Sequence, residues 1–107
     1  MKYEVFIISD AEQDLIDIYS YIAIHHSTER AENLFSQIES VCYSLDHMPE
    51  RGHLPPELDR IGIYEYREIH CKVYRIIYQI LDKSVFIHCI IDGRRDLQSI
   101  LPERLLR

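Results

Sequence analysis

This sequence is poor in the residues that mark several classes of protein. Its 107 residues include 3 cysteines, 3 glycines, 4 prolines and no tryptophan. The cysteines Cys42, Cys71 and Cys89 are odd in number and have no CxxC spacing, which indicates a reducing cytoplasm rather than a disulfide scaffold. The three glycines stand singly, so the chain has no GxGxxG or P-loop motif for a nucleotide. We therefore expect no cofactor.

Long hydrophobic runs are also missing. No apolar stretch approaches the roughly 20 residues that a membrane-spanning helix needs. Residues 1–9, MKYEVFIIS, are too short for a signal peptide and lack a small-residue cleavage site. A composition of 47% hydrophobic and 28% charged residues is that of an ordinary globular protein. We expect one domain over residues 1–107, located in the cytoplasm and without a membrane partner.

Positive charge is scarce, because the formal net charge is −6. Residues 1–61 carry 4 basic and 12 acidic side chains, whereas residues 62–107 carry 8 basic and 6 acidic ones. A protein that binds nucleic acid mainly through phosphates normally shows a basic surface. This chain offers at most a local basic patch in its second half, so its charge favours a protein partner.

The N-terminal half predicts one strand and two helices. Residues 3–9 are β-rich and apolar, and Ser9 and Glu12 have the spacing of a capping box that would start a helix. A second helix would begin after Ser27 or Thr28. Apolar residues recur at helical spacing in both segments: Ala11, Leu15, Ile18 and Ile22, then Ala31, Leu34, Ile38, Val41 and Leu45. The short link between them predicts an antiparallel helix hairpin.

The C-terminal half predicts a meander of three strands followed by a helix. The strand-like runs are residues 63–70, 73–81 and 85–91, and they follow a proline-rich loop. Asp96 would cap the last, short helix. The predicted order is β-α-α-β-β-β-α, an α+β domain in which the helix hairpin packs on an antiparallel sheet.

The arginines of the second half are the strongest candidates for a binding cluster. They are Arg67, Arg75, Arg94 and Arg95. Adjacent strands lie about 4.8 Å apart, so side chains on one face can converge on a single anion, which guanidinium groups bind bidentately. Whether Arg67 and Arg75 share a face depends on a register that the sequence does not fix. In the alternative interpretation, Asp92 and Asp96 pair with Arg94 and Arg95 and lock the strand to the helix.

Other polar residues suggest weaker candidates. Tyr64 and Tyr66 fall in the most polar predicted strand and are expected to meet a partner, because tyrosine is enriched in interface centres. The acidic residues of the first predicted helix, Asp10, Asp14 and Asp17, are interpreted as a solvated surface.

The histidines offer acid/base chemistry only under one condition. His70 and His88 would serve as general bases only if a substrate pocket formed between them. The neighbours Cys71 and Cys89 raise a zinc alternative, if the two strands lie side by side. Structural zinc usually has more closely spaced ligand pairs, so we expect no metal.

Six segments in this order resemble the RelE/ParE superfamily of bacterial toxins from type II toxin–antitoxin systems, and within it the ParE branch. They read SDAEQDLIDIYSYI, AENLFSQIESVCYSL, MPERGHLPPEL, YEYREI, YRIIYQI and IIDGRRDLQSIL. The resemblance runs nearly end to end and implies the fold of that superfamily, whose order of elements agrees with the prediction above.

The resemblance implies two activities. RelE-like members are ribosome-dependent endoribonucleases that cut mRNA, whereas ParE-like members poison DNA gyrase by binding and block replication. In both branches an antitoxin wraps its tail around the toxin, and its other domain usually binds the operon's DNA. The implied partners are thus an antitoxin and DNA gyrase, with operator DNA contacted only through the antitoxin.

Carrying the RelE pattern over, Arg75 matches the arginine of the central strand and Arg95 the arginine after the last strand, with Arg67 near the basic positions of the preceding strand. A RelE-like ribonuclease would use these arginines, with His70 or His88 as the candidate acid/base group. The C-terminal tyrosine of RelE is replaced by Leu101. Because gyrase poisoning requires no catalytic group in the toxin, we expect a gyrase-inhibiting toxin that arrests growth and stabilises a plasmid or prophage. An mRNA endoribonuclease and an inactive relative kept for complex formation are the alternatives.

Overall fold

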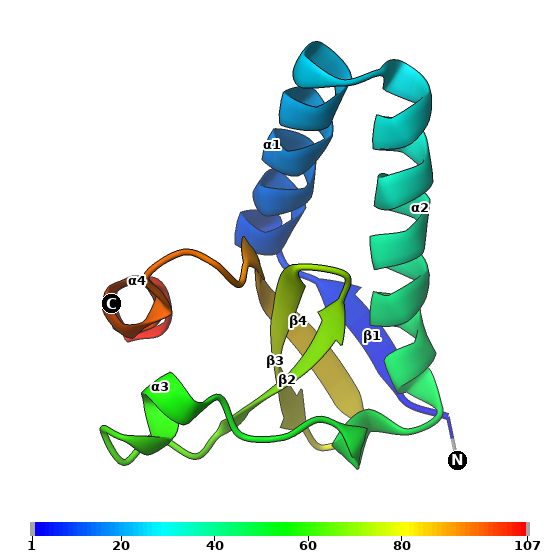
Figure 1. The fold of residues 1–107 in the computed structure, drawn as a ribbon. Helices are drawn as coiled ribbons and strands as arrows, with labels where there is room; N and C mark the ends of the chain where they lie inside the picture. Colours follow the sequence, from blue (N-terminus) through cyan, green and yellow to red (C-terminus); the bar gives the residue numbers. More distant parts are fainter. Residues whose placement is uncertain (1, 107) are drawn as a thin grey trace.

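The computed structural model describes residues 2–106 and contains four strands and four α-helices. The elements are β1 (Glu4–Ile7), α1 (Ser9–His25), α2 (Thr28–Tyr43), α3 (Pro56–Asp59), β2 (Tyr66–Cys71), β3 (Tyr74–Leu81), β4 (Ser84–Asp92) and α4 (Leu97–Leu105), shown in Figure 1. The predicted order is confirmed, with the short α3 added inside the proline-rich loop. None of the helices between residues 2 and 106 has both the length and the hydrophobicity that a membrane crossing requires.

The sheet is mixed, with the strand order β1-β4-β3-β2. β2, β3 and β4 form the predicted antiparallel meander. Two tight turns, at Lys72 with φ 54° and at Asp82 with φ 55°, reverse the chain after β2 and β3. β4 therefore runs in the same direction as β1, and the two pair in parallel from Glu4↔Ser84 to Ile7↔Ile87. The expectation of a wholly antiparallel sheet was wrong for this one pair.

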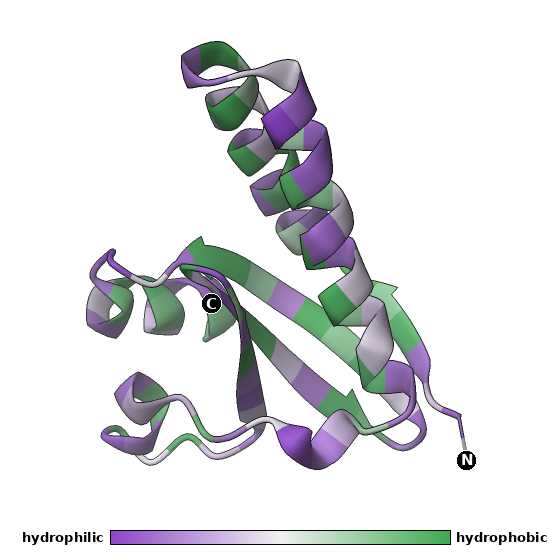
Figure 2. Ribbon diagram, turned by 45° about the vertical axis from the view of Figure 1, so that its right-hand side comes forward, coloured by the Kyte–Doolittle hydropathy of each residue, from purple (hydrophilic) through white to green (hydrophobic). Residues whose placement is uncertain are grey.

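Each face of the sheet is covered by helices. The α1–α2 hairpin packs on one face around a buried cluster that includes Ala11, Leu15, Ile38, Cys42, Ile76, Tyr78 and Ile87, so the predicted helical stripes are confirmed. α3 and α4 cover the other face, where the buried cluster consists of Leu58, Tyr66, Ile77, Cys89, Ile91, Leu97 and Leu101. Hydrophobic residues alternate with hydrophilic ones along both long helices (Figure 2). The outer ends of α1 and α2 project beyond the sheet (Figure 1).

Two of the three predicted helix caps form. The Ser27 side chain caps α2 and the Asp96 side chain caps α4. The capping box predicted at Ser9 is wrong, because α1 already begins at Ser9 and has no side-chain cap. The backbone N–H of Ile8 donates to the carbonyl of Ile87 at 3.2 Å, so the chain passes from the sheet directly into the helix.

Asp14 has a structural role and does not belong to a freely solvated surface, which corrects its interpretation from sequence. Its carboxylate accepts a hydrogen bond of 2.9 Å from the backbone N–H of Ile90 and two from the Arg104 guanidinium, at 3.1 and 2.9 Å. The pairing of β1 with β4 ends at Ile87, so the N–H of Ile90 has no partner strand. Because a buried N–H without a partner is costly, Asp14 takes the place of the missing strand and ties α1 to β4 and α4.

Candidate functional site

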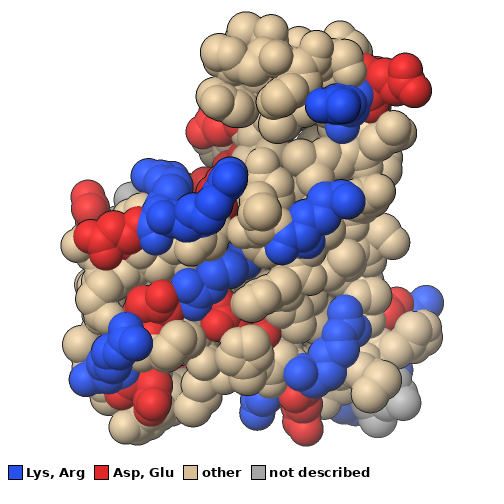
Figure 3. All heavy atoms as spheres, viewed as in Figure 1, with Lys and Arg blue, Asp and Glu red and all other residues tan. Residues whose placement is uncertain are grey.

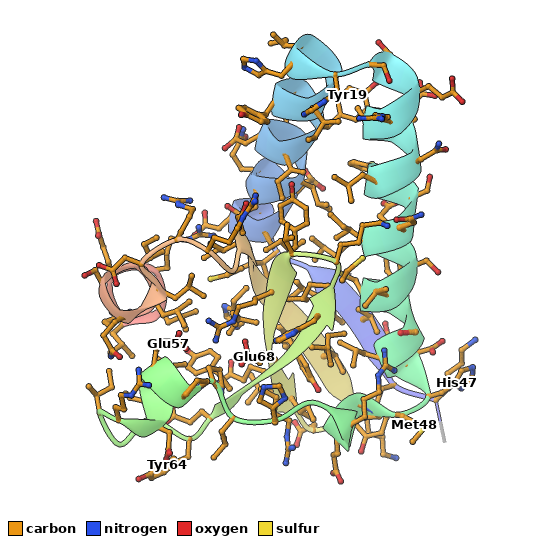
Figure 4. All side chains as sticks on the ribbon, viewed as in Figure 1. Tyr19, His47, Met48, Glu57, Tyr64 and Glu68 are labelled. Carbon is orange, nitrogen blue, oxygen red and sulfur yellow. The ribbon has the colours of Figure 1, made fainter. Side chains whose placement is uncertain are left out.

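Arg75 lies on the sheet face opposite the helix hairpin, enclosed by two carboxylates. Its Nε donates to Glu68 Oε1 at 2.6 Å, and its two terminal nitrogens bind Glu57 bidentately at 2.8 and 2.7 Å. The side chains of Arg75, Glu57 and Glu68 are only 12%, 14% and 2% exposed. Glu57 comes from α3 and Glu68 from β2 (Figure 4).

The register of β2 and β3 brings these charges together. It places His70 opposite Arg75, and Glu68 lies two residues before His70 and so on the same face. α3 supplies Glu57 in its first turn. The hydrogen bonds from Arg75 hold the pKa of Glu57 below its ordinary value. Arg75 is therefore a charge-compensated cation, and it is not free to anchor a phosphate.

Arg67 lies on the opposite face of β2. The register pairs it with Tyr78, whose side chain belongs to the cluster beneath the helix hairpin. The Arg67 guanidinium donates to the carbonyls of Glu50 and Gly52 at 3.2 and 2.9 Å. Arg67 and Arg75 thus lie on opposite faces of the sheet, which answers the question of register that the sequence left open and excludes one anion site shared by these two arginines.

Two histidines complete the group around Glu68. His53 Nε2 lies 2.9 Å from Glu68 Oε2, and His70 Nε2 lies 3.8 Å from Glu68 Oε1. The rings of His53 and His70 meet edge to face with their centres 5.6 Å apart. We call His53, Glu57, Glu68, His70 and Arg75 the Arg75 cluster. His53 was missed from sequence because nothing in its proline-rich loop predicts that the loop pairs with β2 at Glu68.

His70 and His88 form no common pocket, because β3 separates β2 from β4. The ring of His88 packs edge to face on Tyr66, with ring centres 5.4 Å apart, and burial lowers its pKa. The zinc alternative based on the cysteines fails because the two thiols lie on opposite faces of the sheet. Cys71 packs under the helix hairpin, whereas Cys89 packs on the opposite face.

Of the two tyrosines expected to meet a partner, only Tyr64 is accessible. It lies in the loop before β2 and is 61% exposed, whereas the predicted strand included it. Tyr66 is 7% exposed within the smaller buried cluster, and burial raises its pKa. The expected contact of Tyr66 with a partner is therefore incompatible with its place in the fold.

Arg94 and Arg95 follow the end of β4. Of the two ion pairs in the structural interpretation, the one between Asp92 and Arg94 is confirmed and the one between Asp96 and Arg95 is not. Arg94 pairs with Asp92, with 2.6 Å between Arg94 Nη2 and Asp92 Oδ2, and its backbone N–H donates to the same carboxylate at 2.9 Å. Asp96 instead accepts from the Ser99 hydroxyl at 2.8 Å. In the part of the chain that the structure describes, the Arg95 side chain makes no hydrogen bond or ion pair and is exposed.

Arg94 and Arg95 border a groove between α1 and the end of β4. Its lining combines charged and aromatic side chains, among them Asp14, Asp17, Tyr21, His26, Tyr74, Arg94 and Arg95. On the face shown in Figure 3, basic side chains are scattered among uncharged and acidic ones and form no continuous basic surface. This arrangement suits a partner that presents mixed charge and apolar side chains better than a nucleic-acid backbone.

The pairing of Asp92 with Arg94 predicts an unusual titration. Hydrogen bonds from Arg94 lower the pKa of Asp92 to about 2. We expect Arg94→Gln to return this pKa toward 3.8, whereas Arg95→Gln moves it much less. Side-chain carboxyl shifts in an NMR pH titration measure both values. Since the pKa of Asp92 is lower in the folded protein, the pair of Asp92 and Arg94 stabilises the fold above pH 3.8. This stabilisation is lost as the pH falls toward 2. An unchanged Asp92 titration in Arg94→Gln would contradict the assignment.

Solved structures with this fold come from toxin–antitoxin systems. The chromosomal ParDE system of P. aeruginosa matches with a TM-score of 0.72 and 16% identity, covering 85% of this chain and 96% of that one. The toxin–antitoxin complex RelBE2 of Mycobacterium tuberculosis matches with a TM-score of 0.63 and 19% identity, covering 86% and 99%. A mutant of the E. coli toxin RelE in the free state matches with a TM-score of 0.67 and 17% identity, covering 100% of this chain and 98% of that one. No curated protein sequence matches significantly.

The family assignment follows from the sequence itself. The family described as ParE toxin of type II toxin-antitoxin system, parDE, matches residues 5–97, which extend from β1 to the first residue of α4. The matched range includes the helix hairpin, the three-stranded meander and the two exposed arginines after β4. The chain therefore belongs to the ParE toxin family of type II toxin–antitoxin systems, within the RelE/ParE superfamily.

Proposed function

We propose that this toxin inhibits DNA gyrase by binding, which blocks replication, and that a cognate antitoxin neutralises it in the cytoplasm. The observation that carries the proposal is the enclosure of Arg75 by Glu57 and Glu68. A ribonuclease of RelE type would need this arginine for the phosphate of its substrate. Here two carboxylates already occupy the guanidinium and would repel a phosphate, which favours binding over RNA cleavage.

The residues at the expected catalytic position give further support, because no phenol is free there for the acid/base chemistry of a RelE-like enzyme. Leu101 stands there and is fully buried in α4. The nearest alternative in the sequence, Tyr78, is also buried. Its hydroxyl donates to the carbonyl of Pro49 at 2.6 Å and accepts from the N–H of Gly52 at 3.1 Å. Gyrase inhibition by binding requires neither group.

The ParDE and RelBE2 structures come from toxin–antitoxin systems, and we extend the antitoxin partner to this chain. The groove between α1 and the end of β4 is the surface we assign to the antitoxin or to gyrase. Its rim holds the exposed Arg95, and Tyr21 of the same lining is 59% exposed. A segment with acidic and apolar side chains fits such a surface. Operator DNA would be contacted only by the antitoxin.

A supercoiling assay with purified gyrase tests the proposal. We expect the chain to abolish supercoiling and trap cleaved DNA, and the antitoxin to reverse both effects. Arg95→Glu should weaken the inhibition or the antitoxin binding about tenfold or more, because it reverses a charge at the groove. Lys83→Glu is the matched control, since Lys83 is also exposed and lies just before β4, at the end of the strand away from the groove. Active gyrase at a concentration that still arrests growth would refute the proposal and favour ribosome-dependent mRNA cleavage.

A further inference from the structure

The Arg75 cluster contains three metal-binding side chains that the backbone holds together. His53 and Glu68 face each other across a short antiparallel bridge, with N–H···O distances of 3.1 and 2.8 Å in the two directions. His70 follows two residues after Glu68 and shares its face of β2. All three positions are therefore fixed by backbone hydrogen bonds, and only side-chain rotations remain.

The distances between the donor atoms suit one small cation. The three ligand atoms lie within 4.8 Å of one another. Tetrahedral zinc, with bonds of roughly 2.0 to 2.1 Å, separates its ligand atoms by about 3.3 Å. His53 Nε2 lies 2.9 Å from Glu68 Oε2, close to this value. His70 Nε2, in contrast, lies 3.8 Å from Glu68 Oε1, the oxygen that Arg75 holds, so the His70 ring must turn toward Oε2. Small rotations of two exposed imidazoles are enough to bring both onto one ion.

Arg75 and Glu57 provide the support that a carboxylate ligand needs. Arg75 Nε holds Glu68 Oε1 at 2.6 Å, which fixes the carboxylate and leaves Oε2 directed at His53. The positive charge of Arg75 is balanced by the bidentate Glu57. With neutral imidazoles, the five side chains of the cluster carry a net charge of −1, which favours a dication.

From this geometry we propose that His53, His70 and Glu68 bind Zn²⁺ or a similar divalent transition metal. Two imidazoles and one carboxylate are ligands for this class of metal, whereas Mg²⁺ and Ca²⁺ prefer oxygen ligands alone. The side chains of His53 and His70 are 63% and 54% exposed, so water can reach a fourth position on the metal. The proposal is independent of gyrase inhibition, because it concerns metal binding by the isolated chain.

Titration calorimetry of the chelator-treated full chain with ZnCl₂ tests this site. We expect one zinc per chain and a melting temperature higher by roughly 10 °C when zinc is about a hundredfold above Kd. His53→Ala and His70→Ala should each weaken binding by about tenfold or more. Both side chains are exposed, so neither substitution should prevent folding. His25→Ala/His26→Ala is the control, because these histidines lie at the end of α1, away from the cluster.

Three results would overturn the proposal. One is the absence of zinc binding by the wild-type chain, which would leave His53 and Glu68 as an ordinary hydrogen-bonded pair. Another is zinc binding that His53→Ala and His70→Ala leave unchanged. The last concerns Co²⁺ as a spectroscopic probe, whose visible bands should show nitrogen and oxygen ligands. A strong thiolate charge-transfer band would instead assign the metal to a cysteine.

Discussion

Replacing Arg75 with methionine is expected to lower the free energy of unfolding by about 3 to 4 kcal/mol, the largest loss among the substitutions considered. Methionine retains much of the side-chain volume but leaves the buried Glu68 carboxylate without its charged partner. A buried and uncompensated carboxylate is far more costly than the loss of an exposed ion pair. Urea denaturation followed by circular dichroism measures the change.

The double variant Arg75→Met/Glu68→Met provides the control for this prediction. Removing both charges should recover most of the lost stability, because an apolar pair of similar volume can replace a buried ion pair at little cost. Arg94→Met serves as the surface counterpart, since the Arg94 side chain is 76% exposed. The single variant Glu68→Met completes the comparison. If the double variant loses as much unfolding free energy as Arg75→Met and Glu68→Met lose together, the coupling between Arg75 and Glu68 is absent.

Acid sensitivity gives an independent measurement of the same cluster. Hydrogen bonds from Arg75 depress the pKa of Glu57 below 4.5. The resulting stabilisation is therefore present above pH 4.5 and is lost as the pH falls through the folded pKa. In Arg75→Met this part of the acid dependence should disappear.

Replacing Gly52 with alanine is expected to cost about 3 kcal/mol, even though its backbone does not require glycine. Its φ of −73° and ψ of 165° are accessible to any residue. The space around Gly52, however, does not admit a side chain, because an added Cβ would collide with the Tyr78 hydroxyl and lie 2.7 Å from the Glu68 carbonyl. The loop must then move away from β2. Thermal or urea unfolding of Gly52→Ala measures the loss.

Gly62→Ala separates this steric effect from backbone strain. Gly62 has a φ of +77° and no atom within 4 Å of an added Cβ, so alanine there should cost only about 1 kcal/mol. A Gly52→Ala protein as stable as the wild type would show that the loop yields easily. Residues 52 and 53 would then be able to move away from β2, and the position of His53 would not be fixed by the fold.

The sequence predicted the elements of this fold because local patterns specify them. Apolar residues such as Leu15 and Ile38 recur at helical spacing, and alternation along residues 73–81 marks a strand. The direction of β1 relative to β4 could not be predicted, since it depends on how the hairpin returns the chain to the free edge of β4. The carboxylate of Asp14 accepts a hydrogen bond from the backbone N–H of Ile90 at that same edge. This role could not be predicted either, because it depends on where α1 lies relative to β4.

The candidate site was predictable in its residue types but not in its geometry. Arg75 was singled out as a charge within an apolar strand, and the structure shows that it is paired. Shifting the register by one residue would exchange the faces of Arg67 and Glu68, and the sequence does not determine that choice. His53 depends on a single bridge between a loop and β2. No periodic pattern predicts such a contact.

The parallel pairing of β1 with β4 also sets the order in which the molecule can assemble during synthesis. β1 and the helix hairpin leave the ribosome before β4, because the strand that β1 requires begins only at Ser84. Until that strand is made, the apolar stripes of α1 and α2 have no sheet to cover. The chain therefore completes its native structure only after β4 has been synthesised, and shorter nascent chains expose the surface that the folded toxin buries.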